Sequence, residues 1–166
     1  MLEELKVRNV IIGKQYENSE NYTRFLEISK MKNLKLLHVS MGDKINVENN
    51  IEILFLFPAT QLITENSLNN NSLVFKLSYK KFSMLFTGDI EEITEERLVE
   101  IYGKGDLLKS TILKVAHHGS KYSSTQKFLE LVKPKIVLIG VGKNNLYGHP
   151  NSDVMERLKE LRCENL

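Results

Sequence analysis

Three short motifs in this 166-residue sequence combine glycine with carboxylate or imidazole side chains. They are Thr87–Asp89 (TGD), His117–Ser120 (HHGS) and Gly148–Pro150 (GHP). Aspartate and histidine supply the anionic oxygen and neutral nitrogen atoms that bind a borderline divalent ion such as zinc. These residue types therefore favour a metal-dependent hydrolytic site. The site they form is incomplete, because no His-x-His cluster occurs anywhere upstream of them.

The first motif follows an apolar run, Phe82–Phe86, that is expected to form a strand. Gly88 lets the backbone turn sharply and present Asp89 at the carboxyl end of that strand, where ligands of layered α/β folds commonly collect. A structural role competes with metal binding, because Asp89 and Glu92 form an Asp-x-x-Glu pattern typical of helix capping. Both roles remain open for Asp89.

The second motif places two histidines at the end of an expected strand, Thr111–Ala116. Adjacent side chains of a strand point to opposite faces, but this rule relaxes where the strand ends. We expect His118 to be a metal ligand and His117 to be an orienting group or proton donor. Ser120 is a weaker candidate for a nucleophile, because no Gly-x-Ser-x-Gly elbow surrounds it.

The third motif ends a long glycine-rich loop, residues 140–150, which also carries Lys143, Tyr147 and His149. Such a loop can bring backbone N–H groups, a lysine and a histidine towards an anionic substrate. The alternative is an ordinary surface loop that leads into a capped helix. The loop does not match the phosphate-binding Gly-x-x-x-x-Gly-Lys-Ser/Thr pattern.

Apolar periodicity predicts the elements that must position these motifs. Hairpins come first and strand–helix alternation follows, which favours one layered α/β domain over residues 1–166. The glutamates at residues 91–96 are interpreted as a solvated helix face rather than a catalytic cluster. Strands are expected at Val7–Ile12, Leu34–Val39, Ile51–Phe57, Leu73–Tyr79, Phe82–Thr87, Thr111–Ala116 and Pro134–Ile139, and helices at Asn21–Met31, Ile90–Tyr102, Thr125–Val132 and Ser152–Leu161.

Composition sets limits on the class of protein. An apolar content of 42% suffices for a substantial core, and a net charge of +2 gives no basic excess typical of a dedicated nucleic-acid binder. The single cysteine, Cys163, cannot form an intrachain disulfide, and the amino terminus lacks a signal-peptide pattern. These features indicate a cytoplasmic protein. No apolar run approaches the ~20 residues that span a bilayer.

Taken together, the motifs resemble the metallo-β-lactamase fold superfamily. Within it, the sequence is most similar to the C-terminal hydrolase domain of DNA-internalisation competence proteins of the ComEC type. The resemblance implies a four-layered αββα sandwich that is N-terminally truncated here, with an apolar face and a sheet edge left open. It rests on four segments in this order: Asn69–Val74, Leu85–Asp89, Leu113–Ser120 and Tyr147–Pro150.

The resemblance also implies roles for individual residues. Asp89 matches a carboxylate that bridges two metal ions, and His118 matches a ligand of the second. The implied cofactor is Zn²⁺ or Mn²⁺, and the implied chemistry is attack by a metal-bound hydroxide on a phosphoester or nucleic-acid-type substrate. The remaining candidates are His117 and His149 as catalytic residues, and Asn70, Ser72, Ser120, Lys143 and Tyr147 as substrate-binding residues.

The sequence departs from the superfamily at one important point. The first half of such proteins carries a His-x-His-x-Asp-His motif that supplies most ligands, and no such run occurs here. A catalytic zinc keeps three protein ligands, whereas Asp89 and His118 are the clear ones, with His149 as a third candidate. We therefore expect weak metal binding unless an N-terminal complementing chain or a homo-oligomer completes the site. A non-catalytic accessory module and a nucleic-acid-binding remnant remain open alternatives.

Overall fold

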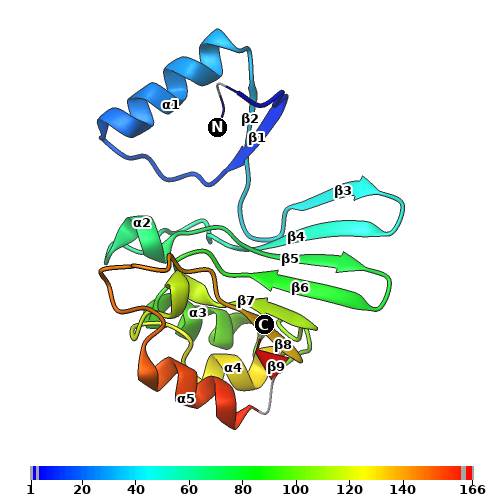
Figure 1. The fold of residues 1–166 in the computed structure, drawn as a ribbon. Coiled ribbons are helices and arrows are strands. Elements are labelled where there is room, and N and C mark those ends of the chain that lie inside the picture. The colour runs from blue at the N-terminus through cyan, green and yellow to red at the C-terminus, as the bar shows by residue number, and fades with distance from the viewer. Residues whose placement is uncertain (1, 3, 162–163, 166) are drawn as a thin grey trace.

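The structure is a computed structural model that describes residues 2, 4–161 and 164–165, so Cys163 lies outside the described residues. The described residues form two sheets, one with two strands and one with seven (Figure 1). Helices connect and flank the strands, as the mixed α/β expectation requires. None of the described helices is both long enough and apolar enough to cross a membrane.

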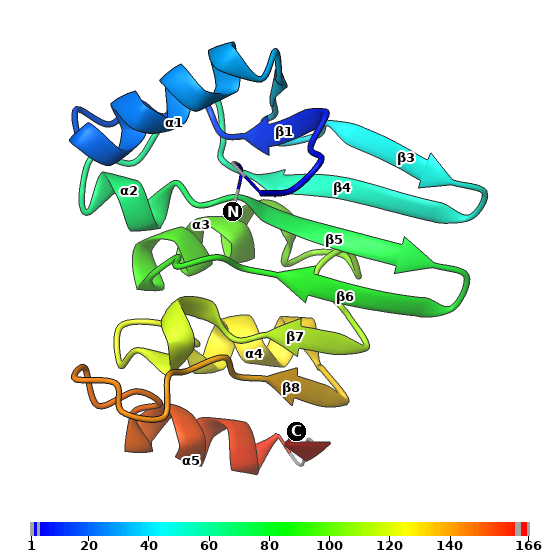
Figure 2. The same ribbon diagram turned by 45° about the horizontal axis from the view of Figure 1, so that its top comes forward.

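The smaller sheet belongs to an N-terminal β–α–β unit. Strands β1 (Asn9–Ile12) and β2 (Lys35–His38) pair in parallel, and helix α1 (Glu20–Met31) connects them. The Ser19 hydroxyl caps α1 by accepting a hydrogen bond from the Tyr22 N–H at 3.2 Å. In both views this unit lies beside the β3–β4 end of the larger sheet, away from helices α4 and α5 (Figures 1 and 2).

The larger sheet has the strand order β3-β4-β5-β6-β7-β8-β9. Pairing is antiparallel from β3 to β6 and parallel from β6 to β9. The hairpin predicted around Lys80 joins β5 to β6, and Lys80 takes a positive φ of 53° there. The strands are β3 (Lys44–Glu48), β4 (Ile51–Phe57), β5 (Val74–Tyr79), β6 (Phe82–Phe86), β7 (Ile112–Lys114), β8 (Ile136–Leu138) and β9 (Glu164–Asn165).

Helices α3 (Glu92–Tyr102), α4 (Gln126–Val132) and α5 (Ser152–Glu160) pack on one face of the larger sheet (Figure 2). Burial of apolar surface between this face and the helices forms the main core. The buried side chains of this core include Leu56, Val74, Leu85, Leu98, Leu113, Leu129, Val137 and Leu158.

The opposite face of the larger sheet is also apolar. Leu85, Leu113 and Val137 lie side by side on neighbouring strands and are buried against the helices. Successive side chains of a strand alternate between faces, so the next residue along each strand belongs to the opposite face. The adjacent row points away from α3–α5, and its side chains are partly exposed. That row consists of Ile53, Leu77, Met84, Ile112 and Ile136. The sheet therefore presents an apolar face on which none of the helices α3–α5 packs.

The structure confirms the predicted strands and helices, with small shifts at their ends. The strand expected over Thr111–Ala116 is shorter, because the chain turns into a short 3-10 segment, Ala116–Gly119, soon after β7. Two short elements were not predicted. Helix α2 (Ser67–Asn70) lies in the asparagine-rich stretch that was interpreted as turns, and β9 adds an edge strand at the carboxyl end.

Candidate metal-binding site

The turn after β6 presents Asp89 to solvent. The Thr87 hydroxyl donates to the Lys114 carbonyl at 2.6 Å, and the Asp89 N–H donates to the Ser72 hydroxyl at 3.2 Å. The Asp89 side chain itself is 45% exposed. The N-cap residue of helix α3 is Glu91, two residues after Asp89. The capping interpretation of Asp89 is therefore wrong, and its carboxylate is available for a ligand.

Gly88 is required by this turn, and its replacement gives a testable prediction. Its φ is +55°, and a Cβ atom added there would lie 2.6 Å from the Ser72 Cβ. We expect Gly88→Ala to lower the free energy of unfolding by about 2 kcal/mol or more, because it adds both strain and a clash. Urea unfolding measures this, with Gly105→Ala as the control, since open space surrounds Gly105. Equal stability of the two variants would contradict the prediction.

The two histidines of the second motif lie in a tight turn rather than on a strand. His117 and His118 have φ values of 46° and 56°, in the left-handed region that non-glycine residues rarely adopt. The His117 N–H donates to the Gly88 carbonyl at 3.0 Å, which ties this turn to the Asp89 turn. At Gly119 an added Cβ would lie 2.7 Å from that of Pro150, so the third motif packs directly on the second. The structure thus brings the three motifs together.

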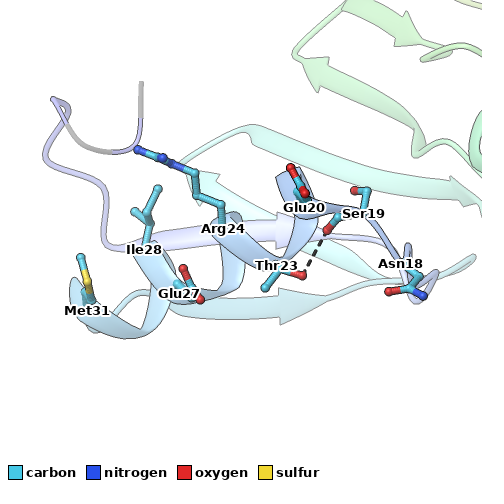
Figure 3. A pocket seen from close by; sticks show the side chains of 8 residues that line it. All are labelled: Asn18, Ser19, Glu20, Thr23, Arg24, Glu27, Ile28 and Met31. Atoms are coloured by element: carbon cyan, nitrogen blue, oxygen red, sulfur yellow. Dashed lines mark hydrogen bonds between the residues drawn. The ribbon is translucent and has the colours of Figure 1, made fainter.

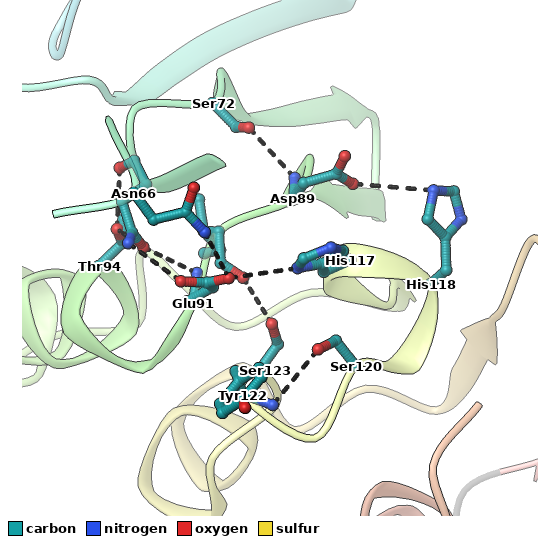
Figure 4. A network of polar contacts seen from close by, with 12 residues as sticks. Asn66, Ser72, Asp89, Glu91, Thr94, His117, His118, Ser120, Tyr122 and Ser123 are labelled. Carbon is teal, nitrogen blue, oxygen red and sulfur yellow. Dashed lines mark hydrogen bonds and ion pairs between the residues drawn. The ribbon is translucent and has the colours of Figure 1, made fainter. Parts of the chain in front are cut away.

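His118 has the arrangement of a metal ligand. Its Nδ1 lies 2.5 Å from the Gly140 carbonyl oxygen, which can only accept a hydrogen bond. Nδ1 therefore carries a proton, and in the neutral ring the lone pair lies on Nε2. That Nε2 lies 3.9 Å from the Asp89 Oδ1, and Figure 4 shows the two side chains facing each other. Histidine ligands in metalloproteins usually donate their second ring N–H in this way.

Asp89 and His118 fit two ligand positions of one divalent ion. Metal–ligand bonds of about 2.0–2.2 Å let two atoms roughly 4 Å apart reach a shared ion. Among the described residues, however, no group of three or more His, Cys, Asp or Glu side chains is placed to hold a metal. Two donors are fewer than the three protein ligands of a catalytic zinc site, so these residues alone do not form one.

His117 and His149 lie beside this pair of ligands. Their rings are 5.8 Å apart, edge to face, and the Tyr147 ring stacks on His149 at 5.9 Å. Burial, together with the nearby His117 and His118, lowers the pKa of His149 below its usual value. A hollow of about 220 Å³ opens between His118, Tyr147 and His149. The hollow therefore lies beside His118, one member of the Asp89–His118 pair.

Asn145 fixes the position of His149 in its loop, which predicts a local effect. Its side-chain amide donates to the His149 carbonyl at 2.8 Å and accepts from the His149 N–H at 2.9 Å. In Asn145→Ala we expect the His149 amide to exchange with solvent about tenfold faster or more, because each lost bond is worth about 1 kcal/mol. Hydrogen exchange measures this, with the exposed Asn144→Ala as control. Unchanged protection in Asn145→Ala would show that other contacts hold the loop.

Of the residues named as substrate-binding candidates, two lie inside the protein and a third, Ser72, is partly buried. Asn70 is fully buried and Ser120 is 2% exposed. The Ser72 hydroxyl accepts the Asp89 N–H, and the Ser120 hydroxyl accepts the Tyr122 N–H at 3.4 Å. In this structure these side chains position loops rather than face the hollow. Lys143 and Tyr147 differ from them, because both are exposed on the third motif's loop.

The interpretation of residues 91–96 as a solvated helix face is wrong for two of the four glutamates. Glu95 is fully buried and accepts the N–H groups of Ser124 and Thr125 at 2.6 and 2.7 Å, and its burial raises its pKa to about 7. Glu91 is half-buried beside His117, with 3.6 Å between Oε1 and Nδ1. Neither the burial of Glu95 nor the contact of Glu91 with His117 can be predicted from the sequence, because both depend on the orientation of helix α3 in the fold.

A second hollow, of about 620 Å³, lies along the outside of α1 and is unrelated to the three motifs. Figure 3 shows its lining, in which the Thr23 hydroxyl donates to the Ser19 carbonyl at 3.1 Å. Arg24, Glu27 and Met31 complete its visible wall. None of the predicted site residues lines it, so the chemistry predicted from the sequence lies at the larger sheet.

Comparison with known proteins gives sequence relatives but no matching family model. The chain is 28% identical over 159 residues to ComE operon protein 3 of Bacillus subtilis, a match that covers 96% of this chain and 20% of the relative. It is 36% identical over 91 residues to competence protein ComA of Neisseria gonorrhoeae, covering 55% of this chain and 13% of the relative. The chain therefore spans a fifth or less of these relatives.

Among solved structures, the fold is similar to a Parabacteroides distasonis protein designated a metal-dependent hydrolase. The TM-score is 0.54 with 15% identity, over 97% of this chain and 77% of that one. At this identity the likeness shows the fold alone. The chain is thus related in sequence to competence proteins, and its mixed α/β fold resembles that of this metal-dependent hydrolase.

Proposed function

We propose that this chain is the C-terminal part of a metal-dependent hydrolase of the metallo-β-lactamase fold, acting on phosphoester or nucleic-acid-type substrates. The observation that carries the proposal is the pairing of Asp89 with His118. The Asp89 carboxylate and the His118 Nε2 face each other at 3.9 Å, while Nδ1 contacts the backbone carbonyl of Gly140.

The remaining ligands would come from a complementing N-terminal chain or from a second copy of this chain. The open apolar face of the larger sheet supports this part of the proposal, because such a face is normally covered by another layer. A covering sheet would complete the four-layered αββα sandwich. The bound ion, Zn²⁺ or Mn²⁺, would supply an activated water and stabilise the developing anion.

The chain's own residues would bind and orient. Asp89 and His118 would hold the ion from one side. Tyr147 and His149 line the hollow through which a substrate reaches that pair. Lys143, exposed on the same loop, would attract an anionic group.

The direct test is hydrolysis of a phosphodiester by this chain with Zn²⁺ or Mn²⁺, alone and with an added polypeptide that carries a His-x-His-x-Asp-His run. We expect metal-dependent hydrolysis only in the mixture. His118→Ala should abolish it, whereas His38→Ala, which alters an exposed histidine of β2, should not. Activity that survives His118→Ala would overturn the ligand assignment. A mixture that is inactive with every phosphodiester would overturn the hydrolase proposal in favour of a non-catalytic accessory module.

A further inference from the structure

The Nδ1 atom of His117 is buried and has no hydrogen-bond partner. Leaving such a nitrogen unpaired costs about 1–3 kcal/mol. A charged acceptor, the Glu91 Oε1, lies 3.6 Å away, just beyond hydrogen-bond distance (Figure 4). The side chains of both residues are mostly buried, with 24% of His117 and 17% of Glu91 exposed. A small movement of either side chain would therefore close a charge-assisted hydrogen bond.

The carboxylate of Glu91 is held in place by two asparagine amides. Asn66 donates to Oε1 at 2.8 Å, and Asn70 donates to Oε2 at 3.3 Å. The Asn70 side-chain oxygen in turn accepts the Glu91 N–H at 3.0 Å and the Thr94 hydroxyl at 2.9 Å. Each oxygen of the carboxylate thus accepts a hydrogen bond from an asparagine amide. These contacts restrict the rotation of the carboxylate beside His117.

The other partner is fixed through its backbone. The His117 N–H donates to the Gly88 carbonyl, and the residue takes a left-handed conformation with φ of 46°. Its ring is thereby directed between Glu91 and His149 instead of along the strand. The imidazole has little freedom to seek another partner for Nδ1.

From this geometry we infer that Glu91 is a positioning residue for His117, whose carboxylate keeps the neutral imidazole in the tautomer with its proton on Nδ1. The lone pair is then on Nε2 of a ring that lies edge to face with the His149 ring, 5.8 Å between centroids. The inference rests on the proposed function and deepens it, because it assigns a positioning partner to the imidazole next to His118. It concerns this chain alone and needs no bound metal.

The test is the tautomer of His117 in the metal-free chain, read from long-range ¹H–¹⁵N correlations of the imidazole at alkaline pH, where histidine is neutral. His117→Ala assigns the signals. We expect the Nδ1–H form to predominate in the wild type and to lose its predominance in Glu91→Ala. Glu92→Ala is the matched control, since it removes an exposed carboxylate from the adjacent position, and it should leave the tautomer unchanged.

Two results would overturn the inference. One is an Nε2–H tautomer in the wild type, and the other is an unchanged tautomer in a folded Glu91→Ala variant. Should Glu91→Ala fail to fold, Asn66→Ala replaces it, because Asn66 is exposed and its amide holds the Oε1 that faces His117. That variant should reduce the Nδ1–H population, and no reduction would count against the inference. Failure of the hydrolase proposal would leave these readouts unaffected, so the two can fail separately.

Discussion

Replacing Glu95 by alanine is expected to lower the free energy of unfolding by about 3 kcal/mol, the largest stability effect predicted for this chain. The carboxylate accepts the first N–H groups of the segment that leads into α4, at Ser124 and Thr125. Arg157 of α5 donates to the Ser123 and Ser124 carbonyls beside it. Loss of Glu95 would leave buried N–H groups without acceptors and remove the link between α3, α4 and α5.

Urea unfolding measures this loss, with Glu96→Ala as the matched control on the exposed face of the same helix. A change below about 1 kcal/mol in Glu95→Ala would contradict the assigned role.

Glu95 also makes the stability of the protein depend on pH. Burial raises the pKa of Glu95 from 4.5 to about 7, so the folded state retains a proton that the unfolded state has released. The associated stability is fully present below pH 4.5 and is lost as the pH rises through 7.

The size of this pH effect follows from the shift. About 2.5 pKa units correspond to roughly 3 kcal/mol. Relative to Glu95→Gln, which cannot ionise, the wild type should lose about that much stability between pH 4.5 and pH 8. Parallel stability curves for the two proteins would show that the folded-state pKa of Glu95 is not raised.

Replacing His118 by alanine is expected to reduce the zinc affinity of the chain by about 100-fold or more, the largest binding effect predicted here. Only Asp89 would remain of the two facing ligands, and a single exposed carboxylate binds zinc weakly. Asp89→Asn should weaken binding to a similar extent, because it removes the anionic charge. Isothermal titration with Zn²⁺ compares these variants with His38→Ala, which should bind like the wild type. Equal affinity in His118→Ala and His38→Ala would exclude His118 as a ligand.

The local part of the site was predictable from the sequence. The run Phe82–Phe86 followed by Gly88 predicts a strand that ends in a sharp turn, and the structure has that turn with Asp89 exposed at its end. The position of the His pair after a strand was also predictable. Its left-handed turn was not, because it depends on the bond from the His117 N–H to the Gly88 carbonyl, made by a residue distant in sequence.

The roles of the glutamates could not be predicted, because burial is a tertiary property. Glu91, Glu92, Glu95 and Glu96 look alike in sequence, and helical periodicity does not say which of them faces the core. In the structure Glu95 is enclosed by α4 and α5, whereas Glu92 and Glu96 are exposed. The buried Asn70 is a similar case, since the sequence does not show that its amide donates to the Glu91 carboxylate.

The central claim is that Asp89 and His118 bind one divalent ion. Its most direct test is a Zn²⁺ titration followed through the imidazole nitrogens of His118. We predict that the Nε2 resonance of His118 shifts on coordination, while Nδ1 keeps its proton and its bond to the Gly140 carbonyl. A titration in which zinc leaves the His118 nitrogens unchanged, or displaces the proton on Nδ1, would contradict the claim.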